Sequence, residues 1–320
     1  MGKQSFHELY ENKLPKIKRK LLGKQLSDGL LFKIIMYFLL IVIGFVFIYP
    51  LIYMFSISMM SNVDLVDSSI KWIPSTLNFD NYKFTFRALD LPKSLFVSIF
   101  IAGLSTLVMA TSSALIGYGL ARFKFPGKTL IFGLMIFSYI MPKTLFFIPT
   151  YQIFTTLKLK GTLLSILLPA FTGQGLQASF FILIFFQFFS MIPKSLEEAA
   201  IIDGARSFKI FYKIALPMAT PAFIITFVYG FSLYWNETFL LSTYLGGKYQ
   251  TIPMLLGNLE QTYNKIIGGS GNPSMVADLN FTEAKAFAGT IISILPIIIL
   301  YSIVQRWFVE SIDKSGITGE

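Results

Sequence analysis

Six stretches of the chain contain no Asp, Glu, Lys or Arg, and this pattern limits the possible folds more than any other feature. A helix rises about 1.5 Å per residue, so about 20 apolar residues cross the roughly 30 Å of hydrocarbon in a bilayer. Five stretches reach this length alone, and the third does so when the apolar run beyond Lys143 is added. We therefore predict an all-α membrane protein with six transmembrane helices. The stretches are residues 34–63, 94–121, 129–142, 161–193, 214–236 and 286–305.

The composition agrees with a membrane protein and excludes several kinds of chemistry. Hydrophobic residues make up 54% of the 320 residues and charged residues only 14%, whereas soluble domains carry about 25% charged residues. The chain has no Cys, which excludes disulfides, thiolate metal sites and cysteine nucleophiles. The only His is His7, in the polar amino-terminal tail, so we expect no His-based metal site and no Ser-His-Asp catalysis.

The distribution of basic residues predicts the orientation in the membrane. With the amino terminus inside, 17 of the 27 Lys and Arg residues fall in inner segments and 10 in outer ones. Eight of the 17 lie in residues 1–33, so this tail decides the orientation by the positive-inside rule. We predict a cytoplasmic basic tail over 1–33, a transmembrane domain over 34–308 and a cytoplasmic tail over 309–320. The net charge of +10 then favours anionic lipid headgroups as its counterpart, and not nucleic acid.

The segment between the fourth and fifth predicted spans carries helix signals. Ser195 and Glu198 form a capping-box pattern, which predicts a short helix that begins at Ser195. Gly204 falls where this helix would end, because glycine adopts the left-handed turn conformation at no steric cost. A second helix is predicted over 207–214, and Pro217 is predicted to open the fifth span. The result is a helix–turn–helix on the inner membrane face.

The same segment resembles the EAA signature of permease subunits of binding-protein-dependent ABC importers. The resemblance lies in Glu198-Ala-Ala200, in Gly204 six residues after Glu198, and in Ile214-Ala-Leu216-Pro217. It implies the type I ABC importer permease fold, with coupling helices over 195–216 that dock into a cytoplasmic ATPase. An ordinary capped helix beside the membrane is the alternative reading. The implied ATPase-coupling residues are Glu197, Glu198, Ala199, Ala200, Asp203, Gly204, Leu216 and Pro217.

Further landmarks resemble the carbohydrate branch of this family. The carboxyl-terminal end adds to them, because Gln305-Arg-Trp-Phe-Val309 and Gly316-Ile-Thr-Gly319 resemble the tail of the maltose-type second permease. In that permease the tail contacts the ATPase subunits. The other landmarks are the turn over 119–127, Ile148-Pro-Thr-Tyr151, Leu168-Pro169 and Tyr234-Trp-Asn-Glu237.

The resemblance implies a complex in the plasma membrane of a bacterium. Its other members would be a second homologous permease, two cytoplasmic ATPase subunits and an extracellular solute-binding protein, which the outer segment 244–283 is expected to contact. The cargo would be a sugar or oligosaccharide. ATP and Mg²⁺ would bind to the ATPase subunits, so this chain is expected to be a transport subunit with no catalytic residue and no cofactor of its own.

Four residues are candidates for the translocation path. Lys143 interrupts the third span, where a lysine is costly unless it reaches the interface or faces water. Its side chain either extends to the outer interface or lies in the translocation cavity of the permease, where its ammonium would pair with an acidic sugar. Trp235, Asn236 and Glu237 lie at the outer end of the fifth span. They either anchor the interface, as Trp commonly does, or line the gate or touch the binding protein.

Two other functions remain open from the sequence. One is an importer of another solute class, such as a phosphorylated polyol, which the ligands of the binding protein would reveal. The other is a channel or membrane-embedded sensor that works without ATPase subunits, and a co-purified ATPase would exclude it.

Overall fold

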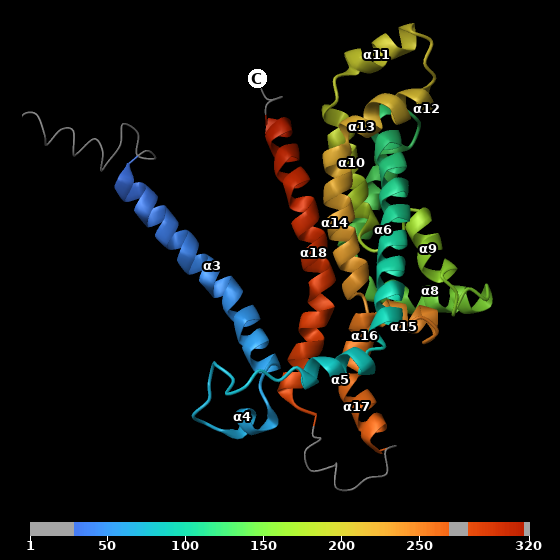
Figure 1. The fold of residues 1–320 in the computed structure, drawn as a ribbon. Coiled ribbons are helices and arrows are strands. Elements are labelled where there is room, and N and C mark those ends of the chain that lie inside the picture. The colour runs from blue at the N-terminus through green and yellow to red at the C-terminus, as the bar shows by residue number, and fades with distance from the viewer. Residues whose placement is uncertain (1–28, 269–280, 317–320) are drawn as a thin grey trace, which may run out of the picture. The chain divides into compact units, whose positions relative to one another are not determined.

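The computed structural model describes residues 29–268 and 281–316, which fold into helices joined by loops (Figure 1). The chain divides into two compact units, one ending at Phe79 and the other beginning at Asp80. Most of the predicted basic tail over 1–33, and Gly319 of the predicted carboxyl-terminal tail, lie outside the described residues.

The first unit consists of a long apolar helix and a short capped one. The helix α3, Leu30–Ser58, exposes large hydrophobic side chains along almost its whole length, as expected of a surface that faces lipid. It is followed by α4, Asn62–Val66, where the Ser61 hydroxyl accepts from the amide of Asp64 at 3.2 Å. The Asp64 carboxylate also accepts from the hydroxyl of Ser75 at 2.5 Å, which closes the loop after α4.

The second unit is a helical bundle. A π-helical turn, Phe211–Ala215, joins α12 to α13. The α-helices in chain order are α5 Asp80–Ala88, α6 Leu91–Arg122, α7 Lys128–Ile140, α8 Thr144–Thr156, α9 Leu164–Phe171, α10 Ala178–Met191, α11 Lys194–Ile202, α12 Ser207–Ile210, α13 Leu216–Met218, α14 Thr220–Asn236, α15 Phe239–Leu245, α16 Ile252–Gly257, α17 Leu259–Gly268 and α18 Glu283–Gly316.

Three of the predicted spans are single helices that are long and apolar enough to cross a membrane: α3, α6 and the part of α18 over Glu283–Trp307. Three further pairs of helices meet the same criteria together, but each is bent by more than 40°. The described residues therefore contain three candidate spans, or up to six if each bent pair crosses the membrane once.

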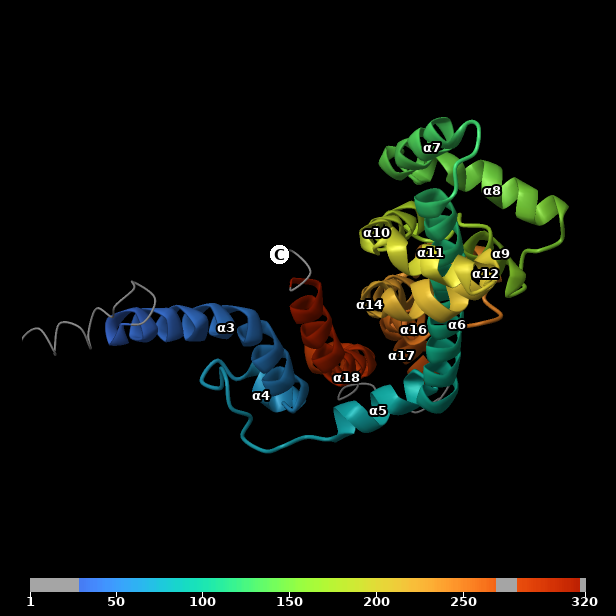
Figure 2. The same ribbon diagram turned by 90° about the horizontal axis from the view of Figure 1, so that it is seen from above.

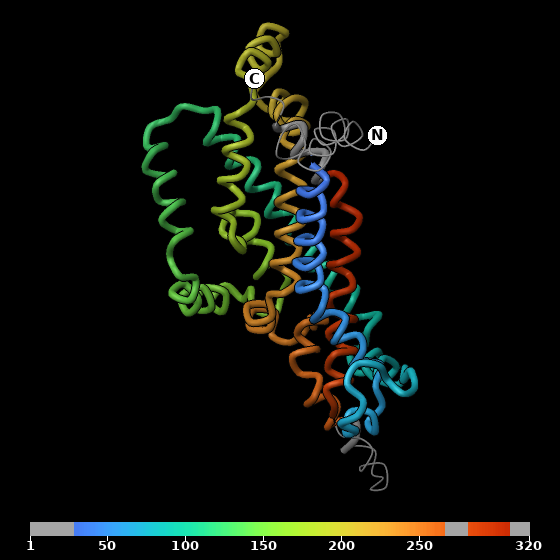
Figure 3. The backbone as a smooth tube through the Cα atoms, turned by 90° about the vertical axis from the view of Figure 1, so that its left-hand side faces the viewer, coloured from blue at the N-terminus to red at the C-terminus, as the bar shows by residue number. Residues whose placement is uncertain are grey.

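The predicted third span bends sharply instead of running straight. Its halves α7 and α8 meet at 103°, and Figure 3 shows α8 turning across the end of α7. The predicted fifth span begins later than expected. Its helix α14 starts at Thr220, after a bend of 72° from the preceding segment, so Pro217 lies in the short helix α13 and does not open the span. Pro221 occupies the first turn of α14, where a proline's missing N–H costs nothing.

The predicted fourth span, 161–193, is two helices in the structure. Residues 172–177 separate α9 from α10, because Gly173 has φ of +74° and Gln177 has φ of +54°. Neither angle is compatible with a right-handed helix. The search for charge-free stretches did not reveal this break, because residues 172–177 contain no charged residue.

The helices α6, α10 and α14 pack side by side at the centre of the bundle (Figure 2). The contact between α6 and α10 depends on Gly117. A Cβ at this position would lie 2.7 Å from the Cβ of Phe185 and 2.9 Å from the backbone nitrogen of Phe186. At the end of these helices nearest α11 and α12 lies an apolar group that we call the inner cluster. It consists of Ala114, Tyr118, Phe185, Phe189, Ile192, Phe211, Ala215, Ala219 and Ala222.

We predict that Gly117→Ala destabilises the purified protein by about 1–3 kcal/mol, because the added methyl group overlaps backbone atoms of α10. Gly119→Ala is the matched control. It lies on the same helix, no heavy atom lies within 4 Å of the added Cβ, and alanine favours a helix. Thermal unfolding in detergent measures both variants. Equal melting temperatures for the two would contradict the close contact of α6 and α10.

Candidate functional site

The α11–α12 segment, residues 194–210, lies at one end of the second unit, opposite α5, α16 and α17 (Figure 1). Its first helix begins one residue before the predicted start. The carbonyl of Pro193 accepts from the amide of Leu196 at 3.3 Å, and no side chain caps the helix. The predicted capping box of Ser195 and Glu198 is therefore wrong. Pro193, with φ fixed at −59°, already directs the chain into the helix, and Ser195 lies inside the first turn.

The turn at Gly204 has the predicted conformation. Its φ is +76°, in the left-handed region. The amide of Gly204 donates to the carbonyl of Ile201 at 2.9 Å, and the amide of Ala205 donates to that of Ala200 at 2.9 Å. These two bonds form a Schellman motif, which ends α11 and satisfies its last carbonyls. A Cβ at Gly204 would meet no heavy atom within 4 Å, so only the backbone angle requires glycine there.

The α11–α12 segment presents apolar side chains that nothing in the described chain covers. Ile202 is 85% exposed and Phe208 is 74% exposed, and Leu196 and Ile201 are also exposed. Glu198 and Asp203 are exposed beside them. Exposed apolar patches with a polar rim are typical of protein-binding surfaces. The surface therefore has the character that a docking element requires.

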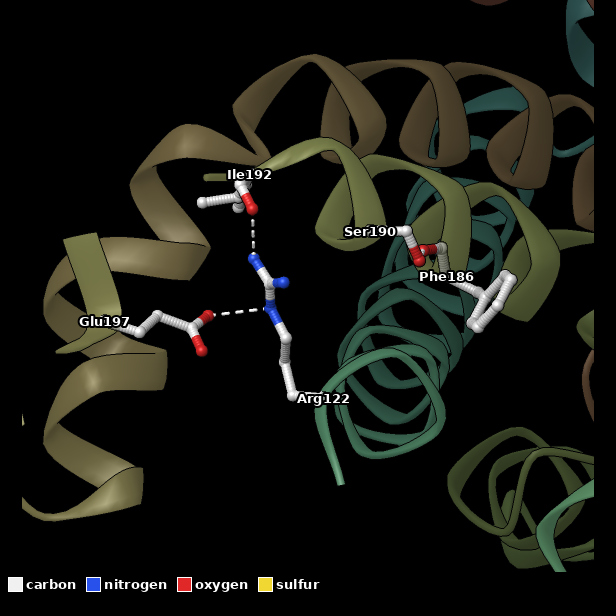
Figure 4. Close-up of polar contacts among 5 residues, drawn as sticks. All are labelled: Arg122, Phe186, Ser190, Ile192 and Glu197. Atoms are coloured by element: carbon white, nitrogen blue, oxygen red, sulfur yellow. Dashed lines mark hydrogen bonds and ion pairs between the residues drawn. The ribbon is translucent and has the colours of Figure 1, made fainter. Parts of the chain in front are cut away.

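Glu197 points the other way, into the protein (Figure 4). Its carboxylate lies 2.7 Å from Nε of Arg122, at the end of α6. The Nε–H is not aligned for a hydrogen bond, so the contact is an ion pair. Nη2 of Arg122 donates to the carbonyl of Ile192 at 2.6 Å. The side chains of Arg122 and Glu197 are only 6% and 15% exposed.

The sequence placed Arg122 and Glu197 in separate motifs and did not pair them. The one signal in the sequence was their opposite charge, since Arg122 lies at the inner end of the second predicted span and Glu197 lies in the next inner segment. The remaining residues of the predicted coupling set lie along the same stretch of chain. Ala199 and Pro217 are exposed, and Ala200 and Leu216 are half-buried.

A cavity of about 960 Å³ lies at the α7–α8 bend, the α9–α10 break and the α14–α15 junction. Of the four candidate path residues, Lys143 and Glu237 line it, and they carry opposite charges. Trp235 does not line it. That side chain is 2% exposed and stacks on Phe231 with ring centroids 5.6 Å apart. Asn236 does not line the cavity either, and its amide donates to the carbonyl of Ser232 at 2.8 Å.

Aromatic rings and uncharged polar groups make up much of the cavity wall. The sequence did not identify these residues, because they come from helices far apart in the chain. The aromatic lining residues are Tyr139, Phe146, Phe147, Phe154, Tyr234, Phe239 and Tyr244. Uncharged polar lining residues include Ser138, Thr144, Thr150, Ser165, Thr172, Gln174, Gln177 and Ser179.

The break between α9 and α10 is held by specific contacts. The Tyr234 hydroxyl accepts from the amide of Leu176 at 3.3 Å. A Cβ at Gly175 would lie 2.8 Å from that hydroxyl, so the residue must be glycine for Tyr234 to come so close. The hydroxyl of Ser112 donates to the carbonyl of Ala170 at 2.6 Å. Irregular backbone at membrane depth is tolerated where it is buried in protein or lines a cavity, and this break does both.

Comparison with known proteins identifies the family. Residues 113–314 match the family described as "Binding-protein-dependent transport system inner membrane component", and the chain belongs to it. It is therefore an inner-membrane permease subunit of an ABC importer, a transport component rather than an enzyme, in a family that carries no cofactor. Membership implies an ATPase and a solute-binding protein as partners.

Several curated relatives extend over most of the chain. The polygalacturonan/rhamnogalacturonan transport system permease YtcP of Bacillus subtilis is 27% identical over 90% of this chain and 99% of its own length. The arabinooligosaccharide permease AraQ of Halalkalibacterium halodurans is 29% identical over 87% and 93%. The trehalose permease SugB of Mycobacterium tuberculosis is 29% identical over 87% and 95%.

The fold also matches a solved structure. A chain of a bacterial ABC transporter involved in the import of the acidic polysaccharide alginate superposes with a TM-score of 0.70 and is 24% identical. The match covers 87% of this chain and 96% of that one. At this identity the match establishes a shared fold.

We predict that Tyr234→Phe destabilises the protein by about 1 kcal/mol, because the Leu176 amide at the helix break loses its acceptor. Tyr229→Phe is the matched control on the same helix, since that tyrosine is 45% exposed. Thermal unfolding of both purified variants measures the difference. A melting temperature for Tyr234→Phe at the wild-type value would show that the hydroxyl does not hold the break.

Proposed function

We propose that this chain is one of two permeases in an importer for a sugar or oligosaccharide. The observation that carries the proposal is the cavity beside the broken helix. Aromatic rings pack against the apolar faces of sugars, and the amide and hydroxyl groups of Gln174, Gln177 and Ser179 are suited to hydrogen-bond sugar hydroxyls. The relatives support this cargo, since those named above are described as permeases for polygalacturonan/rhamnogalacturonan, for arabinooligosaccharides and for trehalose.

The charges in the cavity favour an uncharged saccharide. Lys143 and Glu237 are the two ionisable side chains of opposite sign among its lining residues, and their charges offset each other. An acidic saccharide or a phosphorylated polyol is the second candidate, which the ammonium of Lys143 favours. For such a cargo the ammonium of Lys143 would pair with the carboxylate or phosphate of the substrate.

The α11–α12 segment is the proposed coupling element of this importer. Its exposed residues Glu198, Asp203, Ile201 and Ile202 would dock into a groove of the ATPase. Closure of two ATPase subunits on ATP would move the segment, and the cavity would open alternately to each side. The proposal includes six spans over 34–308, both termini in the cytoplasm, and a carboxyl-terminal tail that contacts the ATPase through Gly316 and Gly319. Gly316 is the last described residue of α18.

Transport by the whole complex tests the cargo. The permease pair, the ATPase subunits and the binding protein are reconstituted in liposomes with ATP inside. Uptake of a neutral oligosaccharide, a uronic-acid oligosaccharide and a polyol phosphate is then compared. We expect uptake of the neutral oligosaccharide and little effect of Lys143→Gln. Uptake of only an anionic solute, with a loss of roughly ten-fold in Lys143→Gln as for a lost charge-assisted bond, would favour the second candidate. No ATP-dependent uptake of any of the three would contradict both.

We predict that Gly204→Val weakens retention of the ATPase subunits, because a β-branched residue in the left-handed conformation costs more than about 1 kcal/mol. Gly204→Asn should retain most of the ATPase, since asparagine tolerates this conformation. No heavy atom lies within 4 Å of a Cβ built at Gly204, so the backbone angle distinguishes the two variants. The measurement is the amount of ATPase that co-purifies with each variant. If Gly204→Val retains as much ATPase as the wild-type protein, the turn at Gly204 is not part of the docking surface.

A further inference from the structure

We propose that Arg122 is a positioning residue that fixes α11 to the inner end of α6, so that movement of the α11–α12 segment is transmitted to the transmembrane bundle. This inference rests on the proposed function, because it assumes that the segment is the coupling element. It assigns Glu197 to the bundle and leaves Glu198 and Asp203 to face the ATPase.

The position of the guanidinium group is the first argument. Arg122 is the last residue of α6, Ile192 follows the end of α10, and Glu197 lies in the first turn of α11. One side chain therefore contacts two helix termini in addition to its own, at 2.6 Å from the Ile192 carbonyl and 2.7 Å from the Glu197 carboxylate (Figure 4). The two partners stand on either side of Pro193, where α10 and α11 meet at a bend of 71°. The contacts thus fix the angle of this bend.

The way the two ends of the segment are held is the second argument. At the α12 end, Ile210 and Phe211 are buried, and the ring of Phe211 packs on Tyr118 in the inner cluster with centroids 5.0 Å apart. By contrast, α11 contains no buried residue. Among the described residues, the one ion pair that reaches α11 is the pair with Arg122. A push on α11 therefore reaches α6 through this side chain.

Burial and residue type are the third argument. Side chains that are 6% and 15% exposed are shielded from water, and a charge left there without its partner is strongly unfavourable. The pair therefore resists separation far more than an exposed pair would. Arginine suits the position because its planar group carries donors in several directions. A lysine has a single nitrogen and is poorly suited to hold the carboxylate and the carbonyl together.

The experiment uses the reconstituted importer with variants Arg122→Gln, Arg122→Lys and Glu197→Gln. Lys124→Gln is the control, because it removes an exposed positive charge two residues from Arg122. We expect all four to retain the ATPase. Substrate imported per ATP hydrolysed should fall roughly ten-fold in Arg122→Gln and Glu197→Gln, since each leaves a buried charge unpaired. It should fall less in Arg122→Lys, and it should stay at the wild-type value in Lys124→Gln.

A distance measurement separates positioning from a general loss of stability. The chain has no cysteine, so spin labels at Ser195→Cys on α11 and Leu115→Cys on α6 report one distance. Both sites are exposed, and neither belongs to the proposed docking residues. We expect a narrow distribution that is the same with and without ATP, and a clearly broader one after Glu197→Gln.

Unchanged import per ATP and an unchanged distribution in Glu197→Gln would overturn the inference. If Arg122→Gln does not assemble, Glu197→Gln decides, because it keeps the bond between Arg122 and Ile192. Failure of the proposed function looks different. In that case the unaltered complex itself would not retain the ATPase or couple its hydrolysis to uptake.

Discussion

The cost of an unpaired backbone amide in hydrocarbon determines most of this structure. Lipid offers no hydrogen-bond partner, so each stretch of chain in the membrane must satisfy its own amides and carbonyls, and a helix does so along its whole length. One exception is the break between α9 and α10. There the freed groups find partners within the protein, as when the Leu176 amide donates to Tyr234, and the irregular backbone lines a cavity. The constraint thus explains both the regular part of the bundle and the place where its regularity ends.

The two ends of the bundle are built by different interactions. Around the cavity, glycines allow close approach and aromatic rings fill the walls, so the wall is shaped by packing. At the end that carries α11 and α12, one arginine contacts a carboxylate and a carbonyl beside an apolar cluster. Apolar packing permits small sliding movements, whereas a buried ion pair holds a defined geometry. The proposed site for cargo and the proposed site for force therefore differ in stiffness.

The sequence predicted those features that depend on local chemistry. The helices α3, α6 and α18 follow from long charge-free runs, and the turn at Gly204 follows from the position of glycine after a short helical pattern. The break at residues 172–177 escaped prediction because hydropathy does not report the backbone angles of Gly173 and Gln177. The pairing of Arg122 with Glu197 escaped it because the two residues meet only after three helices have packed. The sequence left Trp235 as either an interface anchor or a gate residue, because a tryptophan at the end of a span looks the same in the sequence whether it faces lipid, a gate or the core. In the structure it is buried in the core.

The π-helical turn Phe211–Ala215 has a consequence for how such chains diverge. A π turn holds one more residue than an α turn, and each residue of a helix turns the chain by about 100° around the helix axis. Loss of a single residue there would restore a regular helix and turn α11 and α12 to a different side of the bundle, with every other side chain retained. Between two related permeases, a one-position gap at this turn would thus mean a reoriented docking surface, even where the aligned residues on both sides are identical.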